Sequence, residues 1–172
     1  KELGIKKILL NTFYLGNLID NFIKKKKFDL DVQIINDGNN ILDTGGGILN
    51  MVNSSSEENF LVLNPDTLWN SKYKDEIENM ENFYFKKKLN NILLVVNKRL
   101  SFDTSFNGDF NFFENKLSKE KSNHFIYTGL QIINKEIFNN QIEKNFSISK
   151  TWNNLIESDQ LNGFESNNKF YH

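Results

Sequence analysis

The chain has 172 residues, with 21 Lys and Arg against 22 Asp and Glu, and a formal net charge of −1 at pH 7. That length is enough for one domain with a hydrophobic core, so we expect a single domain over residues 1–172. A charge near zero gives no field that attracts nucleic acid or an anionic membrane, and neither is expected as a partner. The absence of cysteine excludes disulfides, zinc–thiolate sites and a cysteine nucleophile.

The hydrophobic residues are not gathered into a membrane-spanning segment. No apolar run reaches the roughly 20 residues that a spanning helix needs, and no signal peptide is recognisable, so we expect a soluble cytoplasmic protein. The sequence begins close to a strand at "KELGIKKILLNT" and stops inside the aromatic stretch "KFYH". Both ends resemble cut edges, and we expect a domain truncated at both ends.

The first half of the chain alternates between short apolar runs and an amphipathic segment. Residues 8–10 and 31–35 are predicted to be strands, and apolar residues at helical spacing predict a helix between them. The apolar face of this helix consists of Leu15, Leu18, Ile19, Phe22 and Ile23. A glycine-rich loop then leads into a short helix at "ILNMV". The wholly apolar residues 60–63 are expected to form a parallel strand buried on both faces.

The second half continues with a helix over most of residues 71–88 and a buried strand at residues 92–96. "NGDFNFF" resembles a small hairpin. Residues 125–133 are predicted to be a strand interrupted by Gly129, where glycine indicates a bulge or a close approach by a ligand or another backbone. "SISKTWNNLIES" predicts an amphipathic helix, and "GFES" and "KFYH" predict short strands. This alternation favours an α/β fold with a mostly parallel sheet.

The first candidate site is the segment of Thr44, Gly45, Gly46 and Gly47, between a strand and a helix. Glycines there let backbone N–H groups approach a phosphate or a nucleoside closely. The segment is neither a Walker loop nor a G-x-G-x-x-G fingerprint. The alternative is a tight turn that needs positive φ.

The second candidate is Asp66, just past the carboxyl end of the strand at residues 60–63. Ligands of open α/β sheets bind at such ends, and Mg²⁺ prefers one or two carboxylates together with substrate phosphates. A helix N-cap is the alternative role for Asp66. Asp109 is by default a turn residue, and the two histidines, His124 and His172, are too few and too isolated for a metal cluster.

Two motifs in order, "LDTGGGILN" (residues 42–50) and "FLVLNPDTLW" (residues 60–69), resemble those of sugar-phosphate nucleotidyltransferases. The likeness is strongest to the bacterial subgroup of N-acetylmuramate-1-phosphate uridylyltransferase and mannose-1-phosphate guanylyltransferase-like proteins. "LGIKKILLNTFYL", "GDF" at residues 108–110, "YTGLQIIN" at residues 127–134 and "GFESNNKFYH" also resemble family segments. The resemblance covers nearly all 172 residues.

The resemblance implies a three-layer Rossmann-like nucleotidyltransferase fold with a mostly parallel central sheet. It also implies an enzyme that joins a nucleoside triphosphate to a sugar 1-phosphate and releases pyrophosphate, with Mg²⁺ as cofactor. Asp66 would hold the metal. The nucleoside would lie against Thr44 and the three glycines that follow it, and the sugar phosphate would be bound by Asp109, Thr128 and Gly129.

The sequence also departs from the family pattern. The family's first strand and its G-x-G-T-R-x-x-P-K-like signature loop are not present, so we expect the chain as given to be an inactive fragment. His172 stands at or beside the second metal-binding Asp of the family, although hard cations prefer oxygen ligands. An exposed sheet edge would favour a homo-oligomer. The alternative function is a non-catalytic nucleotide or sugar-nucleotide sensor with the same fold.

Overall fold

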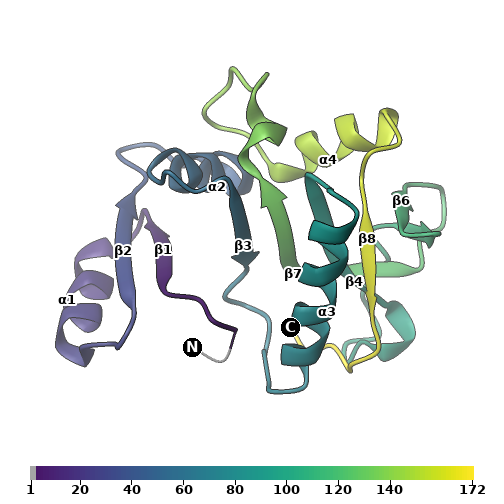
Figure 1. Ribbon diagram of the computed structural model, residues 1–172, viewed down its shortest axis with the longest axis horizontal. Coiled ribbons are helices and arrows are strands. Elements are labelled where there is room, and N and C mark those ends of the chain that lie inside the picture. Colours follow the sequence, from purple (N-terminus) through teal and green to yellow (C-terminus); the bar gives the residue numbers. More distant parts are fainter. Residues whose placement is uncertain (1–2) are drawn as a thin grey trace. The chain divides into compact units, whose positions relative to one another are not determined.

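The computed structural model describes residues 3–172, and the chain divides into two compact units (Figure 1). The first unit comprises residues 1–58 and 138–151, and the second comprises residues 59–137 and 152–172. Helix α4 (Ile148–Glu157) begins in the first unit and ends in the second. The single domain expected over residues 1–172 stays a prediction.

The first unit is built on two parallel strands, β1 (Lys7–Thr12) and β2 (Asp31–Asn36), which pair in register along their full length. Both strands were predicted from their apolar residues and are confirmed. Among the described residues each of the two has one partner strand, so each keeps an edge without a neighbour. The expected homo-oligomer through such an edge stays a prediction.

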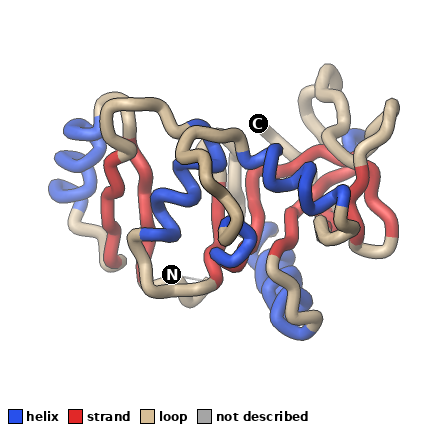
Figure 2. The backbone as a smooth tube through the Cα atoms, turned by 90° about the horizontal axis from the view of Figure 1, so that it is seen from above, coloured by secondary structure: helices blue, strands red, loops and turns tan. Residues whose placement is uncertain are grey.

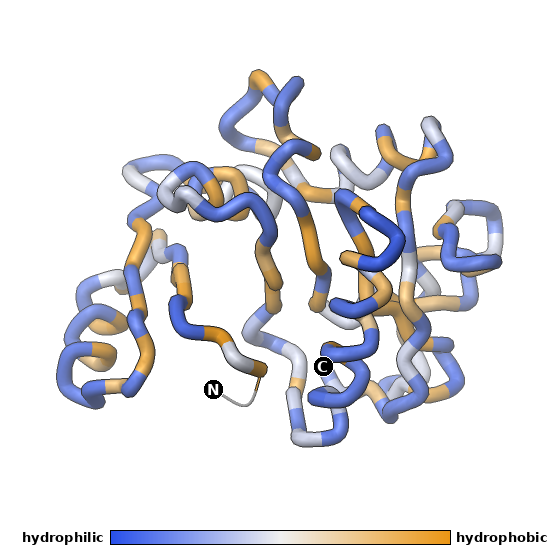
Figure 3. Tube along the Cα trace, in the orientation of Figure 1, coloured by the Kyte–Doolittle hydropathy of each residue, from blue (hydrophilic) through white to orange (hydrophobic). Residues whose placement is uncertain are grey.

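Helices α1 (Gly16–Lys26) and α2 (Asp43–Asn53) complete the regular structure of this unit. Hydrophobic and hydrophilic residues alternate along α1, as Figure 3 shows, but no residue of α1 is buried. Leu18 is 62% exposed and Phe22 is 52% exposed. The helix was predicted correctly. Of its predicted apolar face, Ile19 and Ile23 are partly buried, whereas Leu15 is exposed like Leu18 and Phe22.

The second unit contains a four-stranded sheet with the order β3-β7-β4-β8. Strands are drawn red in Figure 2. Its strands are β3 (Asn59–Leu63), β4 (Asn91–Asn97), β7 (Phe125–Asn134) and β8 (Gly163–Ser166). β7 is antiparallel to both β3 and β4, and β4 is parallel to β8. β3, β4 and β8 therefore run in one direction, and β7 is the exception to the predicted parallel order.

The sheet of the second unit is most deeply buried at β4. Residues 92–96 have no exposed surface, as the run of five apolar residues predicted. β3 differs from its prediction because it lies at an end of the strand order with β7 as its neighbour. Its residues are partly or fully exposed, and Leu63 is 42% exposed, so burial on both faces was wrong.

Helix α3 (Tyr73–Lys86) places four buried side chains at helical spacing: Tyr73, Ile77, Met80 and Tyr84. A hairpin is formed by β5 (Asn111–Phe113) and β6 (Lys116–Ser118), joined by two residues with positive φ. Only its first strand lies within the predicted "NGDFNFF". Short 3₁₀ helices follow β4 (η1, Lys98–Leu100) and β7 (η2, Lys135–Phe138). The predicted strand at "KFYH" is wrong, because Phe170 makes only an isolated bridge.

The helices of the described residues are all too short or too polar to cross a membrane.

Candidate active site

The glycine motif of the first unit forms the first turn of α2 rather than a loop. Gly45, Gly46 and Gly47 are all buried, and none of them has positive φ. The N–H groups of Gly45 and Gly46 both donate to the carbonyl oxygen of Phe146, at 2.9 and 3.1 Å. The first N–H groups of a helix have no partner within it, so Phe146 caps this end. These two amides are used inside the protein.

The glycines are also explained by close packing. A Cβ at Gly46 would lie 2.1 Å from the carbonyl oxygen of Lys144, and one at Gly45 would lie 2.4 Å from the ring of Phe146. A Cβ at Gly47 would lie 2.8 Å from Nδ2 of Asn11. A side chain at Gly45 or Gly46 would displace the backbone of a neighbouring segment, whereas one at Gly47 would only have to move the side-chain amide of Asn11. The predicted turn with positive φ is therefore wrong, and the predicted contact with a nucleoside stays a prediction.

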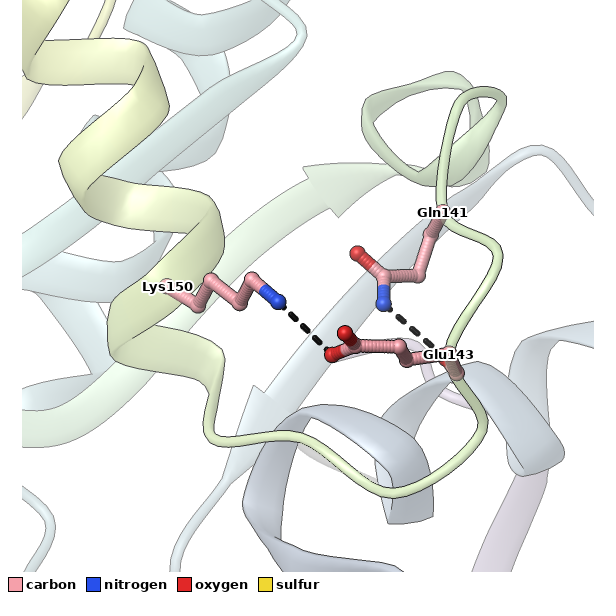
Figure 4. A network of polar contacts seen from close by, with 3 residues as sticks. All are labelled: Gln141, Glu143 and Lys150. Atoms are coloured by element: carbon pink, nitrogen blue, oxygen red, sulfur yellow. Dashed lines mark hydrogen bonds and ion pairs between the residues drawn. The ribbon is translucent and has the colours of Figure 1, made fainter.

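Thr44 joins the start of α2 to the start of α4. Its Oγ1 accepts a hydrogen bond of 3.0 Å from the backbone N–H of Ile148. The segment that leads to α4 is held by Lys150, whose Nζ lies 2.6 Å from Oε2 of Glu143 (Figure 4). The amide of Gln141 donates to the Glu143 carbonyl in the same place. These contacts fix the segment that covers the glycines.

Sequence reasoning missed a polar network at the carboxyl ends of β1 and β2. Asp37 accepts a hydrogen bond from Asn11 on one carboxylate oxygen and from Asn50 on the other, both at 2.9 Å. The parallel pairing of β1 and β2 brings these ends to the same edge. The strand prediction was the signal that could have found it, since it placed Asn11 and Asp37 at adjacent strand ends.

In the second unit, Asp66 lies in the turn after β3, and this turn is attached to β7. The N–H of Asn64 donates to the carbonyl of Gly129 at 2.7 Å. The hydroxyl of Thr67, which is buried, donates to the carbonyl of Thr128 at 2.7 Å. We call these two contacts the clamp. The clamp fixes the backbone on both sides of Asp66, while the Asp66 side chain stays 56% exposed.

Gly129 makes the clamp sterically feasible. Its φ is +90°, which L side chains rarely adopt, and a Cβ would lie 2.9 Å from Cβ of Asn64. The close approach that the sequence indicated is therefore made by the protein's own turn. Thr128 is 1% exposed, and its hydroxyl donates to the carbonyl of Leu94 at 2.9 Å. The hydroxyl and the carbonyl of Thr128 both have partners within the sheet.

His172 lies beside Asp66. Its Nε2 is 3.3 Å from Oδ2 of Asp66. The imidazole also contacts the rings of Phe106 and Phe170, with centroids 5.6 and 6.1 Å away. The backbone N–H of Leu68 donates to the Tyr171 carbonyl at 3.0 Å, which brings the end of the chain to the Asp66 turn. The two predicted metal residues therefore contact each other.

Asp109 supports the start of β7. Its Oδ2 accepts a hydrogen bond of 2.9 Å from the backbone N–H of Tyr127. Desolvation raises the pKa of the Asp109 carboxyl, while this hydrogen bond and the charge of Lys119 act in the opposite direction. The residue does more than occupy a turn, because it fixes the strand that carries the clamp.

The described residues contain no group of three or more His, Cys, Asp or Glu side chains that could hold a metal ion. Asp66 supplies one partly exposed carboxylate at a strand end. That fits Mg²⁺ in the mode in which substrate phosphates and water complete the coordination. The imidazole of His172 does not fit as a Mg²⁺ ligand, because hard cations select oxygen.

Comparisons with known proteins identify the fold of the chain through solved structures. No protein-family model and no curated protein matches the chain. Among solved structures, HddC from Yersinia pseudotuberculosis complexed with GMP-PN superposes with a TM-score of 0.72 at 21% identity, over 99% of this chain and 73% of that one. UDP-glucose pyrophosphorylase from acinetobacter baumanii gives 0.74 at 13% identity, over 99% and 73%.

The inositol-1-phosphate CTP transferase from T. maritima gives a TM-score of 0.73 at 12% identity, over 94% of this chain and 67% of that one. These proteins are similar to the chain across nearly its whole length, while their own chains extend beyond it. The α/β class and the nucleotidyltransferase architecture predicted from the motifs are confirmed. The chain has the fold of the sugar-phosphate nucleotidyltransferases.

Proposed function

We propose that the chain belongs to an enzyme that forms a nucleoside diphosphate sugar from a nucleoside triphosphate and a sugar 1-phosphate, releasing pyrophosphate. The observation that carries the proposal is the clamped, partly exposed Asp66 at the carboxyl end of β3. Ligands of open α/β sheets bind at such strand ends. HddC holds GMP-PN, and a UDP-glucose pyrophosphorylase holds UDP-glucose, which supports a nucleotide and a sugar nucleotide as ligands. The proposed location is the cytoplasm.

In this proposal Asp66 binds Mg²⁺ together with the substrate phosphates. The ion would stabilise the charge that develops as the sugar phosphate oxygen displaces pyrophosphate from the α-phosphorus. The clamp holds the backbone around Asp66, so the carboxylate is presented without a large loss of freedom on binding. The expected contact of Asp109, Thr128 and Gly129 with the sugar phosphate stays a prediction. Within the chain, their hydrogen bonds position β7.

The nucleoside is proposed to lie against the first turn of α2. The N–H groups of Gly45 and Gly46 donate to Phe146, so this contact must use other groups of the turn. Gly47 and Thr44 belong to the same turn, and Thr44 is exposed.

The test is pyrophosphate release from a panel of nucleoside triphosphates and sugar 1-phosphates, measured on the full-length protein because the chain as given is expected to be inactive. We expect Asp66→Asn to lower turnover by about 10²-fold or more, because one charge that stabilises the transition state is lost. Its unfolding midpoint should match the parent, because the side chain is 56% exposed. Glu78→Gln, an exposed carboxylate on α3, is the matched control and should keep full turnover. An Asp66→Asn variant with parental turnover would contradict the proposal.

A second candidate is a nucleotide or sugar-nucleotide sensor without turnover. The contact of 3.3 Å between His172 Nε2 and Asp66 Oδ2 favours it, because the imidazole then occupies a carboxylate oxygen that the metal would need. Calorimetric titration separates the two functions. A sensor would bind a sugar nucleotide and release no pyrophosphate with any pair of the panel.

A further inference from the structure

Tyr127, on β7, carries a buried hydroxyl with no hydrogen-bond partner among the described residues. Its ring packs edge-on against the indole of Trp152, with centroids 4.8 Å apart. A buried polar group without a partner is costly, so such groups in native proteins call for an explanation. A phenol that only filled space could be replaced by phenylalanine at no cost. The unused hydroxyl therefore suggests a partner that arrives later.

The position of Tyr127 indicates that partner. The two residues that follow it, Thr128 and Gly129, accept both hydrogen bonds of the clamp. The turn that carries Asp66 is thus fixed to the strand directly beside Tyr127. Burial raises the pKa of the Tyr127 phenol, and the negative charge of Asp66 raises it further. Asp66 is the charged group that acts on this phenol.

The Asp66 carboxylate has a different contact in this structure. Its Oδ2 lies 3.3 Å from Nε2 of His172, and more than half of the side chain is exposed. Carboxylates that bind a metal are themselves hydrogen-bonded by neighbouring groups, which orient them and tune their affinity. His172 is on the exposed side, where metal and phosphates would have to enter. A donor on the buried side would hold Asp66 without blocking that entry.

We propose that Tyr127 is a positioning residue whose hydroxyl donates a hydrogen bond to the Asp66 carboxylate when Asp66 turns from His172 to hold a metal-bound phosphate. The inference deepens the proposed function and rests on it. It also explains why β7 carries a tyrosine rather than a phenylalanine among its apolar residues.

The test compares Tyr127→Phe with the parent chain in two measurements. Thermal unfolding without metal should be unchanged or slightly raised, because no hydrogen bond of the ligand-free protein is lost. Binding of Mn²⁺, measured by electron paramagnetic resonance with GTP or UTP present, should weaken by about tenfold.

Tyr84→Phe is the matched control. Tyr84 is a buried tyrosine of α3 whose hydroxyl donates to Oδ1 of Asn59 at 2.7 Å. Its loss should lower the unfolding midpoint and leave Mn²⁺ binding as in the parent. The two tyrosines would then show opposite patterns, one in metal binding and the other in stability.

Each outcome is decisive. Tyr127→Phe with parental Mn²⁺ affinity would overturn the inference while leaving the proposed function intact. A drop in stability that accompanies the weaker binding would also overturn it, since the hydroxyl would then be structural. A full-length parent protein that binds no Mn²⁺ with either nucleotide, or an Asp66→Asn variant of it that binds Mn²⁺ equally well, would overturn the proposed function itself.

Discussion

Two regions of the molecule use glycine to bring distant segments together, and they do so with opposite results. In the first turn of α2, Gly46 admits the backbone of Lys144, and the neighbouring amides are capped by Phe146. On β7, Gly129 admits the turn that contains Asn64, and the Asp66 side chain of that turn remains 56% exposed. The first turn of α2 therefore uses its polar amides inside the protein, whereas the turn beside Gly129 leaves the Asp66 carboxylate partly exposed.

The backbone conformations of the two regions differ in the same way. Gly129 has a φ of +90°, so conformation and space both demand glycine. Gly46 has ordinary helical geometry, and space alone demands it. A row of glycines before a helix is therefore not by itself a sign of free amides for a ligand. What matters is whether another part of the chain already uses them.

The largest effect is expected from Gly46→Ala. The new Cβ would lie 2.1 Å from a backbone oxygen, which cannot move aside as a flexible side chain can. Overpacking of this kind destabilises by about 3 kcal/mol, and the better helix propensity of alanine recovers about 1 kcal/mol of that. Urea unfolding would measure the net loss of about 2 kcal/mol.

Asn53→Ala, at the exposed end of the same helix, is the control and should change stability little. If Gly46→Ala unfolded at the parental urea concentration, the covering segment would not be packed as the structure has it. The claim that close packing requires glycine at position 46 would then be wrong.

Gly129→Ala tests the second region, with a smaller expected effect. Alanine there would suffer from the positive φ and from a contact of 2.9 Å with Cβ of Asn64. The conformational part amounts to about 1–2 kcal/mol. Gly38→Ala is the matched control, because Gly38 has a similar φ of +84° and no atom near its Cβ position. Urea unfolding would measure the loss of stability in both variants. A larger loss for Gly129→Ala than for Gly38→Ala would give the contribution of the close packing at the clamp, and equal losses would show that this packing contributes nothing.

Much of the fold could be predicted because the patterns are local. The five apolar residues at 92–96 allow only a buried strand or a short buried helix segment, and their length favours the strand. The direction of β7 could not be predicted in this way. A run of apolar residues has the same pattern in parallel and antiparallel pairs, and only the order β3-β7-β4 settles its neighbours.

The candidate site was less predictable, because its contacts join distant residues. Asp66 and Gly129 were found from local signals, a strand end and a glycine within a strand. That Gly129 faces the Asp66 turn follows only from the pairing of β3 with β7. The cap on α2 comes from Phe146, about a hundred residues later, and nothing near "TGGG" indicates it. The role of Thr67 and the buried hydroxyl of Tyr127 likewise had no local signal.

The smallest effect concerns charge in the second region. The pKa of Asp109 is raised above its ordinary value of 3.8, chiefly by desolvation. Between 3.8 and the raised value the folded chain binds more protons than the unfolded chain, so this group makes stability fall as pH rises. Asp109→Asn keeps a side-chain oxygen that can accept the hydrogen bond from the Tyr127 N–H, but the asparagine side chain cannot ionise. The variant should therefore gain stability relative to the parent as pH rises from about 3 to about 6.

Asp103→Asn gives the opposite sign in the same urea titration. Hydrogen bonds from Ser105 lower the pKa of Asp103, so its contribution to stability is present above 3.8 and is lost as pH falls through the lowered value. That variant should lose stability relative to its parent as pH rises. If Asp109→Asn instead lost stability relative to its parent as pH rises, in the direction expected for Asp103→Asn, desolvation would not dominate the pKa of Asp109.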